Sequence, residues 1–349
     1  MLRREACPEP VEGSALLAMT YSDMLKNLSR RALEFGLTFL LAISINFLLP
    51  RLMPGDPLQL IAGNAAPQLG PERVAALRAQ YGLDKPLHEQ YLIYLWQLAS
   101  GDLGESYRFS GGRSVVEILS ENFRWTLLLV GLSLTLALFI GSALGILSAT
   151  QRGKPFDLSL LSCMYILRSV PPFWLAMLLI PVFAIQMHVL PAGDSYSIPR
   201  AEGWENVKDV ARHALLPASI LTLAYIPTAF TIMRAAMFGI MESDYIRTAR
   251  AKGVRNIWVV LKHGLRNALL PVLTSFMIDL GQLLGGVTVI EAVFNYRGIG
   301  NMMFEAVKSR DYPLLQGGFL LFTITILLLN ILTELLYPFL DPRLRRQTT

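Results

Sequence analysis

Two charged residues lie deep inside apolar stretches of the sequence. Arg168 follows Asp157 by eleven residues, and Asp279 follows Leu269 by ten. If both stretches are membrane helices entered from the cytoplasmic side, a rise of 1.5 Å per residue puts both charges about 15 Å deep, near the bilayer midplane. A charge at that depth is costly unless it is paired or hydrated. Two interpretations stay open: an ion pair that fixes helix packing, or a shared role in a solute pathway.

Other groups capable of chemistry do not form a recognisable catalytic set. His188, His213 and His263 lack paired metal spacing such as His-Glu-x-x-His, and no nucleophile elbow is present. Cys7 and Cys163 are far apart and indicate neither a disulfide framework nor a metal site. We therefore expect no catalytic and no metal-binding residues, and a membrane-embedded enzyme is a weak alternative.

A basic segment near residue 250 carries the most information about function. It reads Asp244-Tyr-Ile-Arg-Thr-Ala-Arg-Ala-Lys-Gly253, and a second apolar segment follows it. The pattern predicts a short basic helix that a glycine ends, and then a helix that returns to the membrane. Positive charge alone is also typical of a solvated cytoplasmic loop. A rigid helix that ends at Gly253 also offers a surface to which another protein can bind.

The composition is that of a membrane protein. The 349 residues are 53% hydrophobic and only 16% charged, with a mean hydropathy of +0.45, whereas soluble domains carry about 25% charge. The net charge is +5, but the basic residues gather beside apolar runs. This distribution follows the positive-inside rule and argues against nucleic-acid binding.

Six stretches are long and apolar enough to cross a bilayer, which takes about 20 residues each. We expect an all-α membrane protein with transmembrane helices near Ala32–Leu52, Trp125–Ala149, Leu158–Leu190, Ala214–Met241, Leu269–Phe294 and Leu315–Leu340. Pro171, Pro172 and Pro181 make a break in the third stretch plausible. Glu291 and Glu334 lie nearer the interfaces, where we expect them to be hydrated or to cap helices.

Lysine and arginine predict the orientation. Basic residues precede the first stretch, lie between the second and third, dominate the loop between the fourth and fifth, and follow the sixth. Both termini are therefore predicted to be cytoplasmic. The expected organisation is a leader or overextended start at 1–24, a first helix at 25–53, an extracytoplasmic region at 54–123, a five-helix core at 124–340 that includes the loop 242–268, and a cytoplasmic tail at 341–349.

The run from Tyr245 to Gly253 resembles the EAA loop of ABC importer permeases, in the form found in the dipeptide, oligopeptide and nickel permease family. Further segments resemble that family in the same order along residues 25 to 346: Pro54-Gly-Asp-Pro57, Tyr81-Gly-Leu-Asp-Lys-Pro86, Gly101-Asp-Leu-Gly104, Pro171-Pro-Phe-Trp174, Leu284-Gly-Gly286 with Glu291, Arg310-Asp-Tyr-Pro313 and Asp341-Pro-Arg343. Ala249 and Gly253 match the signature Ala and Gly of the loop, whereas Arg247 and Thr248 replace its Glu and first Ala.

The resemblance implies a permease subunit in the cytoplasmic (inner) membrane. Its loop would dock on an ATP-hydrolysing subunit through Tyr245, Arg247, Thr248, Ala249, Lys252 and Gly253, and Arg168 and Asp279 are candidates for the translocation pathway. The family implies these partners: a second permease subunit that forms a heterodimer with this chain, two ATP-binding subunits and an extracytoplasmic solute-binding protein. This chain has no Gly-x-x-x-x-Gly-Lys-Ser/Thr motif, because Gly153-Lys154 is followed by proline, so ATP and Mg²⁺ are assigned to the partners.

The solute is expected to be a peptide or a related small molecule such as a nickel chelate. A channel or a secondary transporter is the main alternative of another class. Neither needs a cytoplasmic docking helix ended by a glycine.

Overall fold

The computed structural model describes residues 33–48, 51–52, 70, 72, 75–76, 84–106, 113–309 and 311–340, without the side chains of 282–286 and 334–340. Over these ranges the chain is helical, and its β contact is an isolated bridge between Glu105 and Ser114. The leader at 1–24, the tail at 341–349 and much of the region at 54–123 lie outside the described residues.

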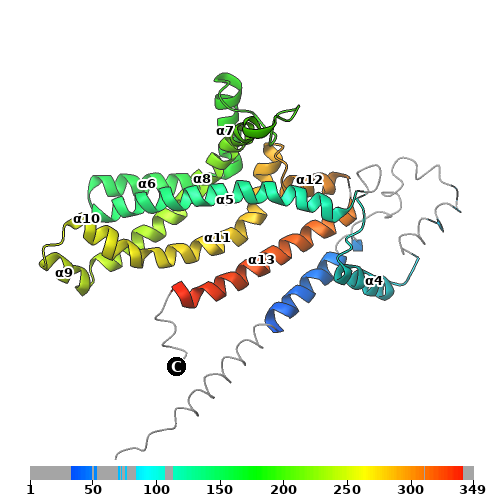
Figure 1. Cartoon of the computed structure of the whole chain (residues 1–349), viewed down its shortest axis with the longest axis horizontal. Coiled ribbons are helices and arrows are strands. Elements are labelled where there is room, and N and C mark those ends of the chain that lie inside the picture. The colour runs from blue at the N-terminus through cyan, green and yellow to red at the C-terminus, as the bar shows by residue number, and fades with distance from the viewer. Residues whose placement is uncertain are drawn as a thin grey trace, which may run out of the picture.

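Figure 1 shows long helices that run roughly along one direction, with short helices at both ends. They are the Leu33–Leu48 helix, α4 (Leu87–Ser100), α5 (Val115–Thr150), α6 (Pro155–Ser169), α7 (Pro172–Ile180) with the π-helical turn η2 (Pro181–Gln186), α8 (Gly203–Met241), α9 (Asp244–Ala251), α10 (Asn256–Trp258), the π-helical turn η3 (Val259–Gly264), α11 (Leu265–Val293), α12 (Ile299–Ser309) and α13 (Tyr312–Leu340).

The centre of the fold is the close pair of α5 and α8. Gly141 and Gly145 stand four residues apart on α5, and a Cβ on Gly141 would lie 2.7 Å from the Cβ of Ala229 on α8. A Cβ on Gly145 would lie 2.8 Å from the carbonyl oxygen of Phe230. Small residues at this spacing let two membrane helices approach until their backbones nearly touch. The pair forms one wall against which α11 packs through Val287 and Ile290.

The third apolar stretch is broken, as its prolines predicted. α6 ends at Ser169, and α7 begins at Pro172 after Pro171. A residue before proline is forced away from helical geometry, and Val170 has an extended ψ of 120°. The two segments are bent by 91° relative to one another, so together they make either one broken span or a re-entrant loop.

By length and hydropathy, three described helices can cross a membrane: α5, α8 and the 312–333 part of α13. The bent pair of α6 and α7 with η2 raises the number to four, and Leu33–Leu48 is a shorter apolar helix. Both α5 and α8 start earlier than the apolar runs predicted. Large apolar side chains on α5 stay exposed, Phe139 by 68%, which suits lipid or another membrane subunit.

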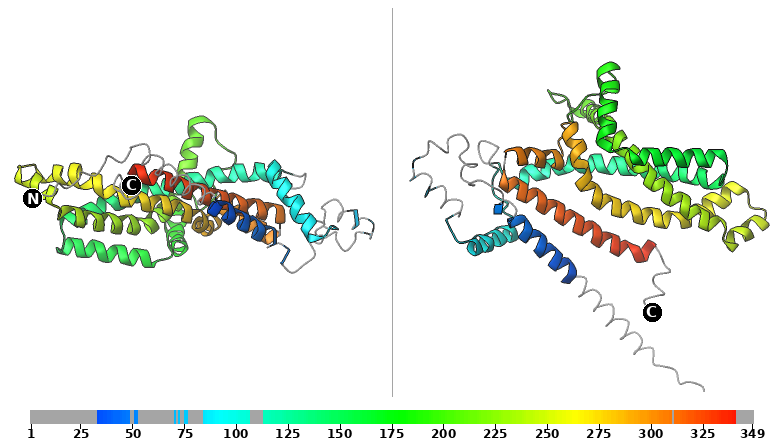
Figure 2. Two further views of the ribbon diagram at one scale, coloured as in Figure 1. Left: turned by 90° about the horizontal axis from the view of Figure 1, so that it is seen from below. Right: turned by 180° about the vertical axis from the view of Figure 1, so that it is seen from behind.

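The two ends of the bundle differ. At one end lie the turn between α5 and α6 and the loop with α9 and α10 (Figures 1 and 2), where Arg152 pairs with Glu242 at 2.5 Å. At the other end, α12 packs on the beginning of α5, with Ile299, Met303 and Ala306 against Val115 and Ile118. The basic turn and the basic loop, predicted to share the cytoplasmic side, therefore share one end.

Candidate functional site

Helix α9 has one buried and one exposed face. Ile246 is fully buried and Ala249 nearly so, and both pack with Val259 of η3. Tyr245, which is 42% exposed, lies on the solvent side. The short helix is therefore fixed to the bundle by its apolar face, while its charged face is free for a partner.

The predicted end of this helix at a glycine is confirmed. Gly253 follows the last turn with φ +74°, and its amide donates to the carbonyl of Arg250 at 3.0 Å. The amide of Val254 then donates to the carbonyl of Ala249 at 3.2 Å. Only glycine adopts this left-handed conformation without a steric penalty, so Gly253 fixes where the chain turns back toward the membrane.

Contacts across the turn at residues 252–255 link α9 to the helices that follow it. α10, η3 and α11 follow one another without a break, and the amide nitrogen of Asn267 on α11 donates to the hydroxyl of Tyr245 at 3.0 Å. Ile257 and Trp258 beside α9 are more than half exposed. α9 is therefore tied to α11 by the apolar contact with η3, which continues into α11, and by the hydrogen bond between Tyr245 and Asn267.

The structure divides the predicted docking residues into two groups. Ala249 points inward and packs on the bundle, so its side chain does not offer a surface to a partner. The other five are exposed: Tyr245, Arg247, Thr248, Lys252 and Gly253. Arg247 is also paired weakly with Asp244 at 3.6 Å, and both side chains are largely exposed.

A buried ion pair next to this end was not predicted. Arg234 of α8 forms two hydrogen bonds of 2.8 Å with the two carboxylate oxygens of Asp157, the third residue of α6. The Asp157 carboxylate is 1% exposed and also accepts from the hydroxyl of Ser148 on α5 and from the amide of Gly153. One carboxylate thus ties three helices together with all its acceptor positions engaged.

The structure does not bring Arg168 and Asp279 together. Arg168 is exposed near the end of α6, and among the described residues no ion pair joins it to Asp279. The carboxylate of Asp279 lies near the hydroxyl of Ser275, at 3.5 Å. An ion pair that fixes packing is therefore not the arrangement seen here, and a role for either residue in transport stays a prediction.

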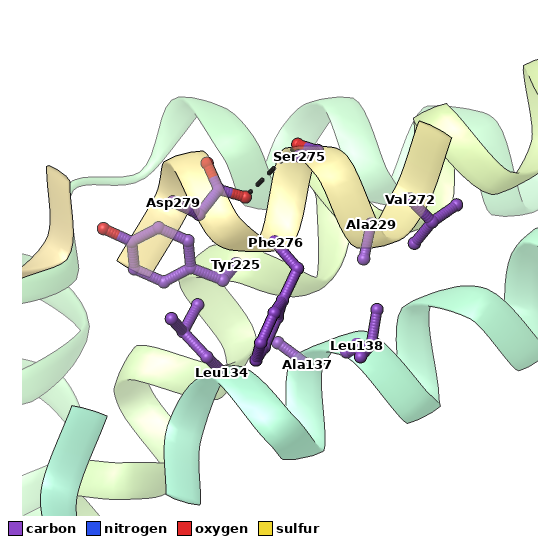
Figure 3. A pocket seen from close by; sticks show the side chains of 9 residues that line it. All are labelled: Leu134, Ala137, Leu138, Tyr225, Ala229, Val272, Ser275, Phe276 and Asp279. Atoms are coloured by element: carbon purple, nitrogen blue, oxygen red, sulfur yellow. Dashed lines mark hydrogen bonds between the residues drawn. The ribbon is translucent and has the colours of Figure 1, made fainter. Parts of the chain in front are cut away.

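Asp279 lines a pocket between α5, α8 and α11 (Figure 3). Its cavity volume is about 20 Å³, which is room for about one water-sized group such as an ammonium, and the space beside it opens to solvent. Apolar side chains make most of the wall, and Tyr225, Ser275 and Asp279 provide its polar groups. The residues that line it are Leu134, Ala137, Leu138, Tyr225, Ala229, Val272, Ser275, Phe276 and Asp279.

Glu291 is fully buried near the opposite end, and of the two alternatives expected for it, hydration or helix capping, the structure shows helix capping. Its carboxylate accepts from the hydroxyl of Thr126 at 2.7 Å and from the amides of Gly300 and Asn301, at 2.7 and 3.2 Å, in the first turn of α12. A helix N-terminus favours negative charge. A Cβ on Gly298 would lie 2.0 Å from this carboxylate. Glu334 lies outside the described side chains.

Only some of the residues in these sites can be predicted from their neighbours in the sequence. Ser275 is one turn from Asp279 on α11, so helical spacing alone would have placed it in the pocket. Tyr225 and Arg234 come from α8 and meet partners far away in the sequence. Arg234 stands near the end of an apolar run, and nothing in its local sequence points to Asp157.

Comparison with known proteins agrees with this architecture. Residues 141–346 match the family described as binding-protein-dependent transport system inner membrane component, and residues 24–129 match the N-terminal family of the same membrane component. A protein named as a peptide permease in Brucella suis biovar 1 is 40% identical over 316 residues, which cover 90% of this chain and 97% of that protein. The glutathione transport system permease protein GsiC of Salmonella choleraesuis is 37% identical over 322 residues, which cover 92% of this chain and 99% of that protein.

Among solved structures, an inward-facing conformation of the MetNI methionine ABC transporter superposes on the fold. The TM-score is 0.54 at 18% identity, and the match covers 65% of this chain and 97% of that chain. At this identity the likeness shows the fold alone. Because the family match spans more than half of the sequence and close relatives span nearly all of it, the chain belongs to the family of binding-protein-dependent transport system inner membrane components, the permease subunits of ABC importers.

Proposed function

We propose that this chain is one of two permease subunits of an ATP-driven importer for peptides or closely related small solutes. It spans the membrane six times with both termini in the cytoplasm. The two relatives above are named for peptide and glutathione transport, and this supports a solute with peptide chemistry. The second permease subunit is a similar but distinct chain.

The observation that carries the proposal is the geometry of α9. A basic helix is attached by Ile246 and Ala249, ended by Gly253 and exposed on its other face. It packs on η3, which continues into α11, and α11 lines the pocket. In this arrangement a partner that pulls on α9 moves a helix of the solute pathway. The partners that act on the importer in this way are two ATPase subunits, which bind ATP and Mg²⁺. For this docking, α9 lies in the cytoplasm.

The opposite end supports delivery from outside. α4, α12 and the loop between α7 and α8 lie away from α9 (Figure 1). A solute-binding protein docks there and releases solute into the pathway. The bundle then exposes the pathway to each side in turn. Exposed apolar side chains on α5 such as Phe139 face lipid or the second permease.

Copurification tests the proposal. The tagged chain, expressed with its ATPase subunit, should retain that ATPase in mild detergent. Arg247→Glu together with Lys252→Glu reverses two charges on the exposed face and should abolish retention. Arg113→Glu, at the opposite end, is the control and should retain the ATPase. Equal retention by all three forms would show that α9 is not the docking site.

Labelling tests the sidedness separately. Arg255→Cys in a chain without its natural cysteines places a thiol on the exposed side of the loop after α9. A thiol reagent that cannot cross membranes should label it only after the cells are permeabilised. Labelling on intact cells would reverse the orientation and contradict the proposal.

A further inference from the structure

We propose that Asp279, with Tyr225 and Ser275, forms a binding site for the free ammonium group at the amino terminus of a peptide. This inference rests on the proposed function, because it assigns a solute group to a position in the pathway. The site is the pocket between α5, α8 and α11.

The position of Asp279 calls for a cation or water beside its carboxylate. It stands fourteen residues from each end of α11, or roughly 21 Å of helix. A carboxylate this far inside a membrane helix carries a desolvation cost that a cation or water must offset. Among the described residues, no arginine, lysine or histidine forms an ion pair with Asp279. The Ser275 hydroxyl, 3.5 Å away, is a weak contact at the edge of hydrogen-bonding distance.

The groups beside Asp279 suit an ammonium ion. An ammonium group has three N–H donors and needs acceptors arranged around it. The Asp279 carboxylate and the Ser275 hydroxyl provide oxygen acceptors from one face of α11, and the Tyr225 hydroxyl belongs to the same pocket from α8 (Figure 3). The Tyr225 ring also provides an aromatic face, which attracts cations.

The rest of the pocket selects what is attached to the ammonium. Leu134, Ala137, Leu138 and Phe276 offer an apolar wall next to the polar groups. The first side chain of a peptide can pack against that wall while its ammonium contacts Asp279. A polyamine places a second charge against apolar surface and is therefore disfavoured. Peptides and glutathione, the solutes in the relatives' names, both carry a free primary ammonium group.

Arg168 is not part of this site. It is exposed on α6, whereas α5, α8 and α11 line the pocket. The structure therefore assigns recognition of the ammonium to Asp279 without a matching arginine for the carboxylate in the same pocket.

Thiol reactivity tests the site without partner subunits or a known solute. In the full-length chain with Cys7→Ser and Cys163→Ser, Ser275→Cys places a thiol one turn from Asp279. We compare its reaction rates with a cationic aminoethyl methanethiosulfonate and a neutral methyl methanethiosulfonate, in nanodiscs. Asp279 should accelerate the cationic reagent selectively, and Asp279→Asn should lower the ratio of the two rates by about tenfold.

Controls keep this result specific. Glu205→Gln removes an acid twenty residues along α8 from Tyr225, roughly 30 Å away, and should leave the ratio unchanged. If Ser275→Cys does not fold, Val272→Cys provides a second position in the pocket wall. A ratio that does not change with Asp279→Asn at either position would overturn the proposal.

Protection of the introduced thiol by added solutes shows which kind of molecule supplies the ammonium group. Trialanine should slow labelling of the introduced thiol at millimolar concentration, whereas N-acetyltrialanine and putrescine should not. Equal protection by N-acetyltrialanine would show that the ammonium is not recognised, and equal protection by putrescine would overturn the assignment to a peptide terminus. Because no ATPase is present, a failure here is distinct from a failure of ATP-driven import.

Discussion

Asp157 and Asp279 are carboxylates on helices of the same bundle, and their surroundings are opposite. Asp157 is 1% exposed and bound by Arg234, Ser148 and Gly153. Asp279 is half-buried beside a pocket, and Ser275 is its hydrogen-bond partner. The first arrangement leaves no acceptor for a ligand, whereas the second leaves most of a carboxylate available. The contrast separates a charge that holds helices together from one that can bind solute.

The largest loss of stability is expected at the buried ion pair of Arg234 and Asp157. Arg234→Ala leaves Asp157 buried without its cation, and removal of one partner of a buried pair costs about 3–5 kcal/mol. The variant should lose most of its folded protein in a thermal assay read by size-exclusion chromatography. The double variant with Asp157→Ala should recover part of that loss.

Arg152→Ala is the matched control, because it breaks an ion pair at the same end whose side chains are 59% and 68% exposed. Exposed pairs are worth about 0–1 kcal/mol. An Arg234→Ala variant as stable as Arg152→Ala would remove the structural role assigned to the buried pair.

The second largest effect concerns Glu291, a third carboxylate that is bound mainly by backbone. Gly298→Ala places a methyl group 2.0 Å from its carboxylate, so the carboxylate must leave its position at the start of α12, or α12 must shift. Overpacking of this kind costs about 1–3 kcal/mol. Gly131→Ala, in open space inside α5, should instead stabilise the protein by up to about 1 kcal/mol. Similar melting temperatures for both variants would show that α12 is not held at this point.

A smaller effect on stability, with a large effect on transport, is expected at α9. Gly253→Asp forces a side chain into left-handed geometry, which costs about 1–2 kcal/mol, and adds negative charge to a basic surface. Membrane insertion should survive while ATP-driven uptake falls. Gly253→Asn tolerates the same backbone better and should retain more uptake. Normal uptake by Gly253→Asp at normal expression would contradict a coupling role.

The smallest effect on stability is expected at Asp279. Asp279→Asn keeps the shape of the side chain, and no described cation is left unpaired, so stability should change by about 0.5 kcal/mol or less. Uptake of trialanine should nevertheless fall. A loss of stability comparable to that of Arg234→Ala would place Asp279 with Asp157 as a structural charge.

The sequence predicted features that depend on neighbouring residues. Pro171 and Pro172 predicted the break between α6 and α7, because proline acts on adjacent backbone. Gly253 predicted the end of α9 for the same kind of reason, and basic residues predicted which loops share an end. Such signals are local and need no knowledge of packing.

Contacts between distant helices were not predictable in the same way. Arg168 and Asp279 have the same estimated depth in the membrane. Depth does not determine the direction in which a side chain points from its helix, so equal depth does not predict a contact. The pairing of Arg234 with Asp157 depends on the close approach of α5 and α8 at Gly141 and Gly145, which brings α6 within reach. Glu291 lies near a helix end, and only α12 folding back over it makes that position buried.

ATP dependence of uptake separates an ATP-driven importer from a channel or a secondary transporter most directly. The chain is reconstituted in liposomes with its second permease, ATPase and binding protein, and trialanine or glutathione is the labelled solute. Accumulation against a gradient should require hydrolysable ATP on the side of α9 and should be lost with Gly253→Asp. Accumulation without ATP, driven by an imposed proton gradient, would contradict the proposed function.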